Sequence, residues 1–314
     1  MLNRRHIRIK VMQVLYASNG SESENLKPHE NFLTKSLESL YGLYLAQMSF
    51  LIEIHKKAED HLQKSQNKFL ATSEEKNPNL KFVNNEVLKL IRENEVFLET
   101  LESEKMNLWD IDFEYVDTVF KKILESSLYK SYMSTKTSSF KEDKYFLIDI
   151  FSEIIAPDEK LYDFFEDTKL TWLDDLPVVN TAILKLIRKA KPKSSGTFFT
   201  PKLFKDLEDE KFGMDLLKKT ILNQSFFNAE ISRKTKNWDA DRITQIDTVL
   251  LQMAICEFQK FPSIPVKVTI NEYLEIAKEY STPKSSNFVN GILDKLVREY
   301  KAENSLNKIG RGLM

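Results

Sequence analysis

The feature that most restricts the fold of this 314-residue chain is its shortage of residues that form tight turns. It has only 7 glycines and 9 prolines, about 2% and 3% of the chain against usual shares of about 7% and 5%. Sandwiches, barrels and doubly wound sheets need many tight connections, so the composition argues against them and predicts long helices. Hydrophobic residues make up 42% of the chain, which is ample for a core.

Length and residue usage exclude several classes of protein. The length suggests roughly two domains. A net charge of −1 excludes a uniformly basic coat, so any nucleic-acid surface must be local. The single cysteine, Cys256, excludes a disulfide framework, and His55 and His61 fall on different helical faces, so we expect no metal site.

No apolar run reaches the roughly 18 residues of a membrane span, and the first residues lack the apolar core of a secretion signal. We therefore expect a cytoplasmic protein without a cofactor.

Apolar periodicity predicts helices along most of the chain. In the first helix, residues 4–18, one apolar stripe is formed by Ile7, Val11, Val14 and Leu15. Further helices are expected over 31–69, 84–105, 114–132, 269–280 and 287–301, with another ending at Phe258 after a cap at Asp241 or Thr244. In the 269–280 helix, the residues spaced to face a core are Ile270, Leu274, Ala277 and Tyr280. The Ser134–Ser139 segment suggests a domain boundary.

A weak internal repeat pairs residues 149–172 with 215–238, each ending in tryptophan, Trp172 or Trp238. This favours an equivalent helical unit in both places, although two amphipathic helix pairs of similar composition would look alike. We expect both tryptophans to be packing anchors. Residues 185–205 hold basic side chains and no acidic ones, which fits either a solvated linker or a segment that touches RNA.

The sequence shows no catalytic constellation: it has no glycine-rich phosphate loop and no nucleophile elbow, so we do not expect an enzyme. The first helix is more informative. It carries basic residues next to an amide and an aromatic side chain, Gln13 and Tyr16. Basic side chains bind phosphates, while amides and aromatic rings read unstacked RNA bases. A basic helix is a signal of low specificity, so taken alone this pattern favours a solvated helix that completes a bundle, with RNA binding as the alternative.

Four ordered motifs carry a family resemblance. They are Asn3-Arg4-Arg5 with Arg8, Gln13, Leu15 and Tyr16; Ile246–Glu257; Ile264–Glu272 with Ala277-Lys278; and Phe288-Val289-Asn290-Gly291 with Leu293-Asp294-Lys295. In this order they resemble the NusB family of bacterial transcription antitermination factors, over about residues 1–18 and 205–303. The resemblance implies an all-α, NusB-like pair of helical bundles with a large helical insertion. Residues 1–20 and 205–314 would form the core, and 21–204 the insertion, with one repeat copy at 139–190.

The resemblance also implies a non-catalytic function. The family binds boxA-type RNA of nascent ribosomal transcripts together with the ribosomal protein NusE, in the transcription elongation complex with other Nus factors. The residues that match its RNA-facing positions are Arg4, Arg5, Arg8, Gln13, Ser285, Asn287 and Phe288. Those that match its protein-partner positions are Tyr16, Asp247 and Glu257. The chain departs from the family pattern at His6, Gln252 and Lys284, so its RNA preference is expected to differ in detail.

Several alternatives stay open at this point. Phe288 either stacks on a base or fills the core. Gly291 suggests that another backbone approaches the last helix closely, and Glu272 is expected to cap or pair locally. At the level of function, the alternative is a helical protein-interaction scaffold whose insertion supplies the working surface. A third hypothesis, the NusB-like domain attached to certain ribosomal RNA methyltransferases, requires a glycine-rich cofactor loop that the chain does not provide.

Overall fold

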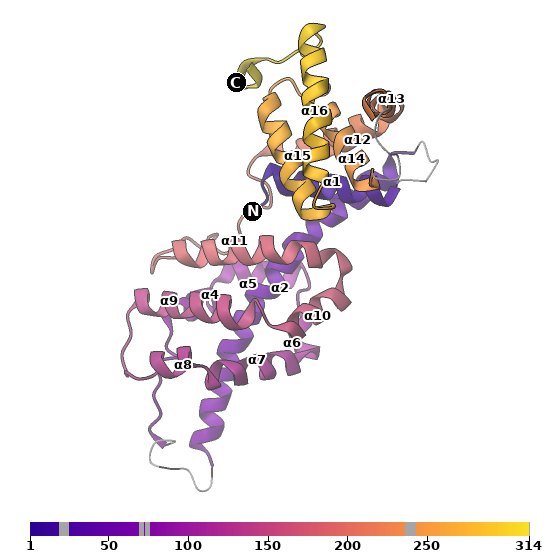
Figure 1. The fold of residues 1–314 in the computed structure, drawn as a ribbon. Helices are drawn as coiled ribbons and strands as arrows, with labels where there is room; N and C mark the ends of the chain where they lie inside the picture. Colours follow the sequence, from indigo (N-terminus) through magenta and orange to yellow (C-terminus); the bar gives the residue numbers. More distant parts are fainter. Residues whose placement is uncertain (19–24, 69–71, 73–75, 236–242, 314) are drawn as a thin grey trace. The chain divides into compact units, whose positions relative to one another are not determined.

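The computed structural model of this protein describes residues 1–18, 25–68, 72, 76–235 and 243–313 (Figure 1). These residues are mostly helical and include no strand, which confirms the predicted all-α fold class. The chain forms two compact units. Unit 1 consists of Met1 and Glu38–Leu203, and unit 2 consists of Leu2–Leu37 and Phe204–Met314.

The division between the units passes through helix α2 (Lys27–Gln66), after Leu37, whereas the sequence resemblance begins the insertion at residue 21. The first turns of α2 belong to unit 2 because they pack there. Leu33 is fully buried, and the carboxylate of Glu30 pairs with Lys218 at 2.8 Å.

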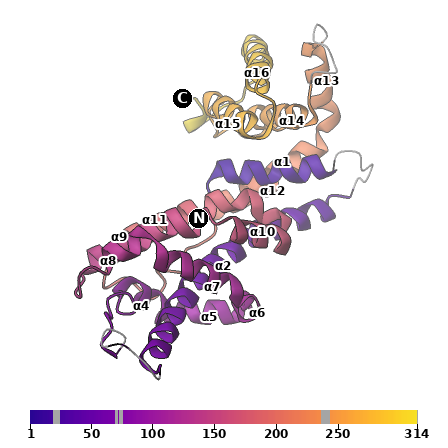
Figure 2. The same ribbon diagram turned by 60° about the horizontal axis from the view of Figure 1, so that its bottom comes forward.

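Unit 2 is organised around α14 (Gln245–Lys260). Every residue from Val249 to Phe258 is buried, and a helix without a polar face must be surrounded by other elements. The helices that pack against it are α1 (Arg4–Ser18), α12 (Leu207–Leu222), α13 (Gln224–Thr235), α15 (Val266–Tyr280) and α16 (Ser285–Ala302) (Figures 1 and 2).

Helix α1 has the predicted bounds, and its apolar stripe is buried. A close approach to α12 fixes its position. A Cβ atom added at Gly213 would lie 2.6 Å from Cγ2 of Ile7, so only glycine lets the two helices come this near.

The core-facing side of α15 differs from the predicted one. The buried residues are Thr269, Tyr273, Ile276 and Ala277, so of the four predicted positions only Ala277 is correct. The prediction counted apolar residues, but this part of the core is polar. The hydroxyl groups of Thr269 and Tyr273 both donate to the buried carboxylate of Glu257.

Helix α16 begins at Ser285, two residues before the predicted start. The expectation of a close backbone approach at Gly291 is wrong, because a Cβ atom added there would meet nothing within 4 Å. The glycine therefore leaves open space beside the helix.

Among its described residues, unit 1 contains the remainder of α2 and ten shorter elements. These are α4 (Glu86–Arg92), α5 (Glu95–Ser103), α6 (Leu108–Ile111), α7 (Phe113–Glu125), α8 (Ser127–Tyr132), α9 (Phe140–Ile150), the π-helix η1 (Phe151–Ile155), α10 (Glu159–Thr168), the 3-10 helix η2 (Leu170–Asp175) and α11 (Leu176–Lys189). Two indole groups anchor them to α2: Trp109 donates to the carbonyl oxygen of Ala46 at 3.0 Å, and Trp172 to that of Ser39 at 2.7 Å. This confirms Trp172 as a packing anchor, whereas Trp238 lies outside the described residues.

Two helices predicted as continuous are each divided. Asn94 ends the first part of the 84–105 stretch, and its side chain accepts from the amide of Phe97 to cap α5. Ser126 does the same for α8 by accepting from the amide of Tyr129. Short polar side chains compete with helical hydrogen bonding in this way. The Ser134–Ser139 segment lies within unit 1, so it does not separate compact units.

Candidate nucleic-acid interface

The N-terminal turn of α1 carries two arginines that remain partly exposed. The side chain of Asn3 accepts from the amide of His6 at 3.0 Å, which caps the helix and fixes its start. Nε of Arg4 donates to Asp209 at 2.7 Å, and Nη2 and Nε of Arg5 donate to the two carboxylate oxygens of Glu272, at 2.9 and 3.0 Å. The side chains of Arg4 and Arg5 keep 33% and 38% of their surface exposed, so both are within reach of a ligand.

Glu272 was expected to pair locally, and that expectation is wrong. Its carboxylate joins α15 to α1 through Arg5, and it also lies 3.6 Å from Nη1 of Arg8. The hydrogen bonds from Arg5 to Glu272 raise the pKa of the arginine. Partial burial lowers this pKa by less, so the pKa of Arg5 lies above its ordinary value. Arg5 therefore carries its charge at every pH at which the protein is studied.

Arg8 is buried, and the prediction that it faces RNA is corrected by this geometry. Its side chain is 2% exposed, and Nε and Nη2 donate to the two oxygens of Glu257 at 2.6 and 2.9 Å. Burial lowers the pKa of Arg8, but the attraction and hydrogen bonds of Glu257 outweigh it and hold the pKa above its ordinary value. Arg8 lies three residues before Val11, so it shares the apolar side of the helix.

Glu257, expected to contact a protein partner, is likewise internal, with no exposed side-chain surface. Its carboxylate accepts from Thr269 at 3.1 Å and from Tyr273 at 2.8 Å, in addition to Arg8. Four hydrogen bonds satisfy this buried anion, as burial of a charge requires. The Arg8–Glu257 pair thus joins α1, α14 and α15 from the inside.

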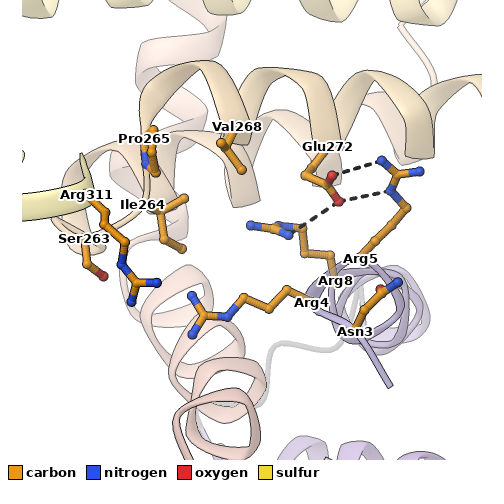
Figure 3. A pocket seen from close by; sticks show the side chains of 10 residues that line it. All are labelled: Asn3, Arg4, Arg5, Arg8, Ser263, Ile264, Pro265, Val268, Glu272 and Arg311. Carbon is orange, nitrogen blue, oxygen red and sulfur yellow. Dashed lines mark hydrogen bonds and ion pairs between the residues drawn. The ribbon is translucent and has the colours of Figure 1, made fainter. Parts of the chain in front are cut away.

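A cavity of about 610 Å³ opens beside the arginines of α1 (Figure 3). One part of its wall is charged and the other largely apolar. The lining residues are Asn3, Arg4, Arg5, Arg8, Ser263, Ile264, Pro265, Val268, Glu272 and Arg311. The close-up shows Arg4 and Arg311 directed toward each other across the opening, with Ile264, Pro265 and Val268 beside them. Sequence reasoning missed Arg311, which lies in the C-terminal 3-10 helix η4 (Gly310–Leu313) and outside every family motif.

The predicted residues near the start of α16 form a second cluster, and most of it faces inward. Asp247 accepts from the hydroxyl groups of Ser281 at 2.8 Å and Ser285 at 2.9 Å, and its amide donates to Thr244 at 3.0 Å. Asp247 and Ser285 are 1% and 2% exposed. The expectations that Asp247 faces a protein and Ser285 faces RNA are therefore corrected: together they hold the α15–α16 loop against α14.

Of the other predicted residues, Phe288 is buried, at 8% exposure, which favours its core role. Asn287 is exposed, and Gln13 is half-buried. The Tyr16 side chain is 45% exposed, at the end of α1 where its carbonyl oxygen accepts from the side chain of Gln245. These three keep surface for a ligand or a partner.

The structure therefore separates the predicted site residues into two groups. Arg4 and Arg5 lie at the start of α1, and Tyr16 lies twelve residues later near its end, which is about 18 Å along a helix axis. A ligand that touches both ends must be extended. Within the described part of the chain, no group of three potential metal ligands comes together. Nor is any described helix both long and apolar enough to cross a membrane.

Comparison with known proteins agrees with the motifs. A family model described as the NusB family matches residues 193–298. The protein named transcription antitermination protein NusB of Salinibacter ruber is 39% identical over 112 residues, which is 36% of this chain and 70% of that relative. Its namesake from Chloroherpeton thalassium is 38% identical over 129 residues, 41% of this chain and 61% of the relative. That of Koribacter versatilis is 39% identical over 101 residues, 32% of this chain and 69% of the relative. No solved structure gave a match.

Proposed function

Because this chain belongs to the NusB family, we propose that it is a non-catalytic, RNA-binding factor of transcription antitermination. Its RNA would be of the boxA type, bound together with the ribosomal protein NusE. The observation that carries the proposal is the pair of partly exposed arginines, Arg4 and Arg5, at the mouth of a cavity in unit 2. Partly exposed guanidinium groups are the side chains best suited to phosphate contacts.

The RNA is expected to be single-stranded and extended along α1. The amide of Gln13 and the ring of Tyr16 lie beyond the arginines on the same helix, where unstacked bases would be read. Asn287 offers a further exposed amide near the start of α16. Of the family's protein-partner positions, Tyr16 alone has substantial exposed surface, so the NusE contact is proposed there.

The test is a titration of the full chain with single-stranded boxA-type RNA at several salt concentrations, with and without NusE. Each phosphate neutralised adds about −0.7 to the slope of log affinity against log salt. Arg5→Ala is expected to reduce the slope by up to about 0.7. Arg298→Ala, which changes an exposed arginine of α16 that does not line the cavity, is expected to leave the slope unchanged. An Arg5→Ala slope equal to that of the wild type would remove Arg5 from the phosphate contacts.

A protein-interaction scaffold is the second candidate, and the surface of unit 1 favours it. Ile111, Phe113 and Leu170 expose 78%, 62% and 72% of their surfaces there, and large apolar side chains exposed in this way are candidates for contact with a partner protein. Two results together would favour the scaffold over the RNA-binding factor. The chain would not bind RNA either with or without NusE, and it would capture a protein partner that the Phe113→Ser variant no longer captures.

A further inference from the structure

We propose that Arg311 binds a phosphodiester of the RNA in the arginine-lined cavity, an inference that rests on the proposed RNA-binding function. The cavity wall holds four arginines. Three of them are already paired with carboxylates: Arg4 with Asp209, Arg5 with Glu272 and Arg8 with Glu257. Arg311 is exposed and makes no ion pair with any described residue.

Arg311 therefore supplies the cavity's uncompensated charge. Within the wall, each of the other three positive charges has a negative partner within 3.0 Å, so each is partly compensated, although the side chains of Arg4 and Arg5 stay 33% and 38% exposed. One surplus positive charge matches one phosphodiester, which carries a single negative charge. The planar guanidinium also presents two parallel donors that fit two phosphate oxygens.

The C-terminal segment is held firmly enough to position this arginine. The amide of Ile309 donates to the carbonyl oxygen of Pro262 at 3.0 Å, and Nζ of Lys308 donates to the carbonyl oxygens of Glu257 and Phe261, both at 3.0 Å. A Cβ atom added at Gly312 would lie 1.9 Å from the carbonyl oxygen of Pro262. Only glycine permits this contact, so the segment is shaped to lie against the α14–α15 loop.

The rest of the cavity wall favours a nucleotide over a simple anion. Ile264, Pro265 and Val268 form an apolar side next to the charged one (Figure 3), and 44% of the Val268 surface is exposed. A ribose or a base offers apolar surface beside its phosphate, whereas inorganic phosphate does not. A volume of about 610 Å³ is also large enough for a nucleotide.

Arg311 lies outside the part of the chain that matches the family model, residues 193–298. The inference therefore assigns to the C-terminal segment a contact that the family motifs do not contain. It predicts that phosphate binding at the start of α1 depends on a residue just over three hundred positions later in the chain.

The experiment is a titration of the full chain with fluorescently labelled single-stranded boxA-type RNA across a salt series. Arg311→Ala is expected to weaken binding several-fold and to reduce the slope of log affinity against log salt by about 0.7. Arg311→Lys keeps the charge and should retain most of the slope. Arg298→Ala, the matched exposed arginine, should behave as the wild type. Gly312→Ala should reproduce the loss seen for Arg311→Ala, because the added methyl group displaces the segment from Pro262.

The outcomes separate this inference from the proposed function. In one, the wild-type protein binds the RNA with a salt-dependent affinity while Arg311→Ala shows the same slope as the wild type. That result would overturn the role of Arg311 and leave the proposed function standing. Wild-type protein without salt-dependent RNA binding would overturn the proposed function and the inference with it. Equal losses for Arg311→Ala and Arg298→Ala would show a general charge effect and would also overturn the specific contact. Circular dichroism of each variant tests whether the fold is retained.

Discussion

Replacing Arg8 with alanine is expected to destabilise unit 2 rather than to remove a contact with RNA. The change would leave Glu257 as a buried carboxylate without a counter-charge. At roughly 4 Å between charges and an effective dielectric constant of about 20, the lost attraction is about 4 kcal/mol. This agrees with the cost of about 3–5 kcal/mol for breaking a buried ion pair by removing one partner.

The expected shift in melting temperature follows from the size of the unit. For a unit of about 150 residues, each kcal/mol corresponds to about 2–4 °C, so Arg8→Ala is expected to lower the melting temperature of unit 2 by about 6–20 °C. Arg5→Ala is the matched control on the same helix. Its partly exposed pair with Glu272 is worth about 0–1 kcal/mol, so its melting temperature should stay close to that of the wild type.

The assay must separate the two units. Thermal unfolding followed by circular dichroism gives the overall stability, and peptide-resolved hydrogen exchange compares α14 of unit 2 with α2 residues of unit 1. Faster exchange in α14 alone is expected for Arg8→Ala. The double variant Arg8→Met, Glu257→Gln should recover part of the loss, because glutamine is neutral and still accepts from Thr269 and Tyr273. Wild-type stability combined with lost RNA affinity in Arg8→Ala would refute the burial argument and return Arg8 to the RNA surface.

Four further outcomes follow from burial. Phe288→Ala should cost about 3–5 kcal/mol of folding stability through the cavity it leaves, measured by urea unfolding. Gly291→Ala should stabilise the protein by up to about 1 kcal/mol in the same measurement, because the added Cβ meets no neighbour. Burial lowers the pKa of His55 from 6.5, so on acidification the unfolded chain takes up a proton more readily than the folded chain. The free energy of unfolding should therefore fall as the pH drops below about 6.5, and it should fall less in His55→Gln. Burial raises the pKa of the Cys256 thiol to about 12, so at pH 8 a thiol reagent should label it only in denaturant.

The helices of this fold are largely predictable because most of them depend on local patterns. Helix α1 has the expected bounds, and α14 is apolar over so many consecutive residues that it had to be the central helix of its unit. The two missed breaks, at Asn94 and Ser126, have a signal of their own, since both are residue types that cap helices. The apolar residues recur at helical spacing across both breaks, so the periodicity predicted one continuous helix in each place despite the capping residue.

The roles of the charged residues were less predictable, because each depends on a partner far away in the sequence. Arg4, Arg5 and Arg8 look equivalent in the α1 sequence, but their carboxylate partners lie 205, 267 and 249 positions away. Those partners decide which arginine is buried and which keeps exposed surface. The residues predicted from the family motif therefore include structural ion pairs as well as surface cations. By the same reasoning, the cation with most charge left for a ligand is the one without a described carboxylate partner, and that is Arg311 rather than any arginine of α1.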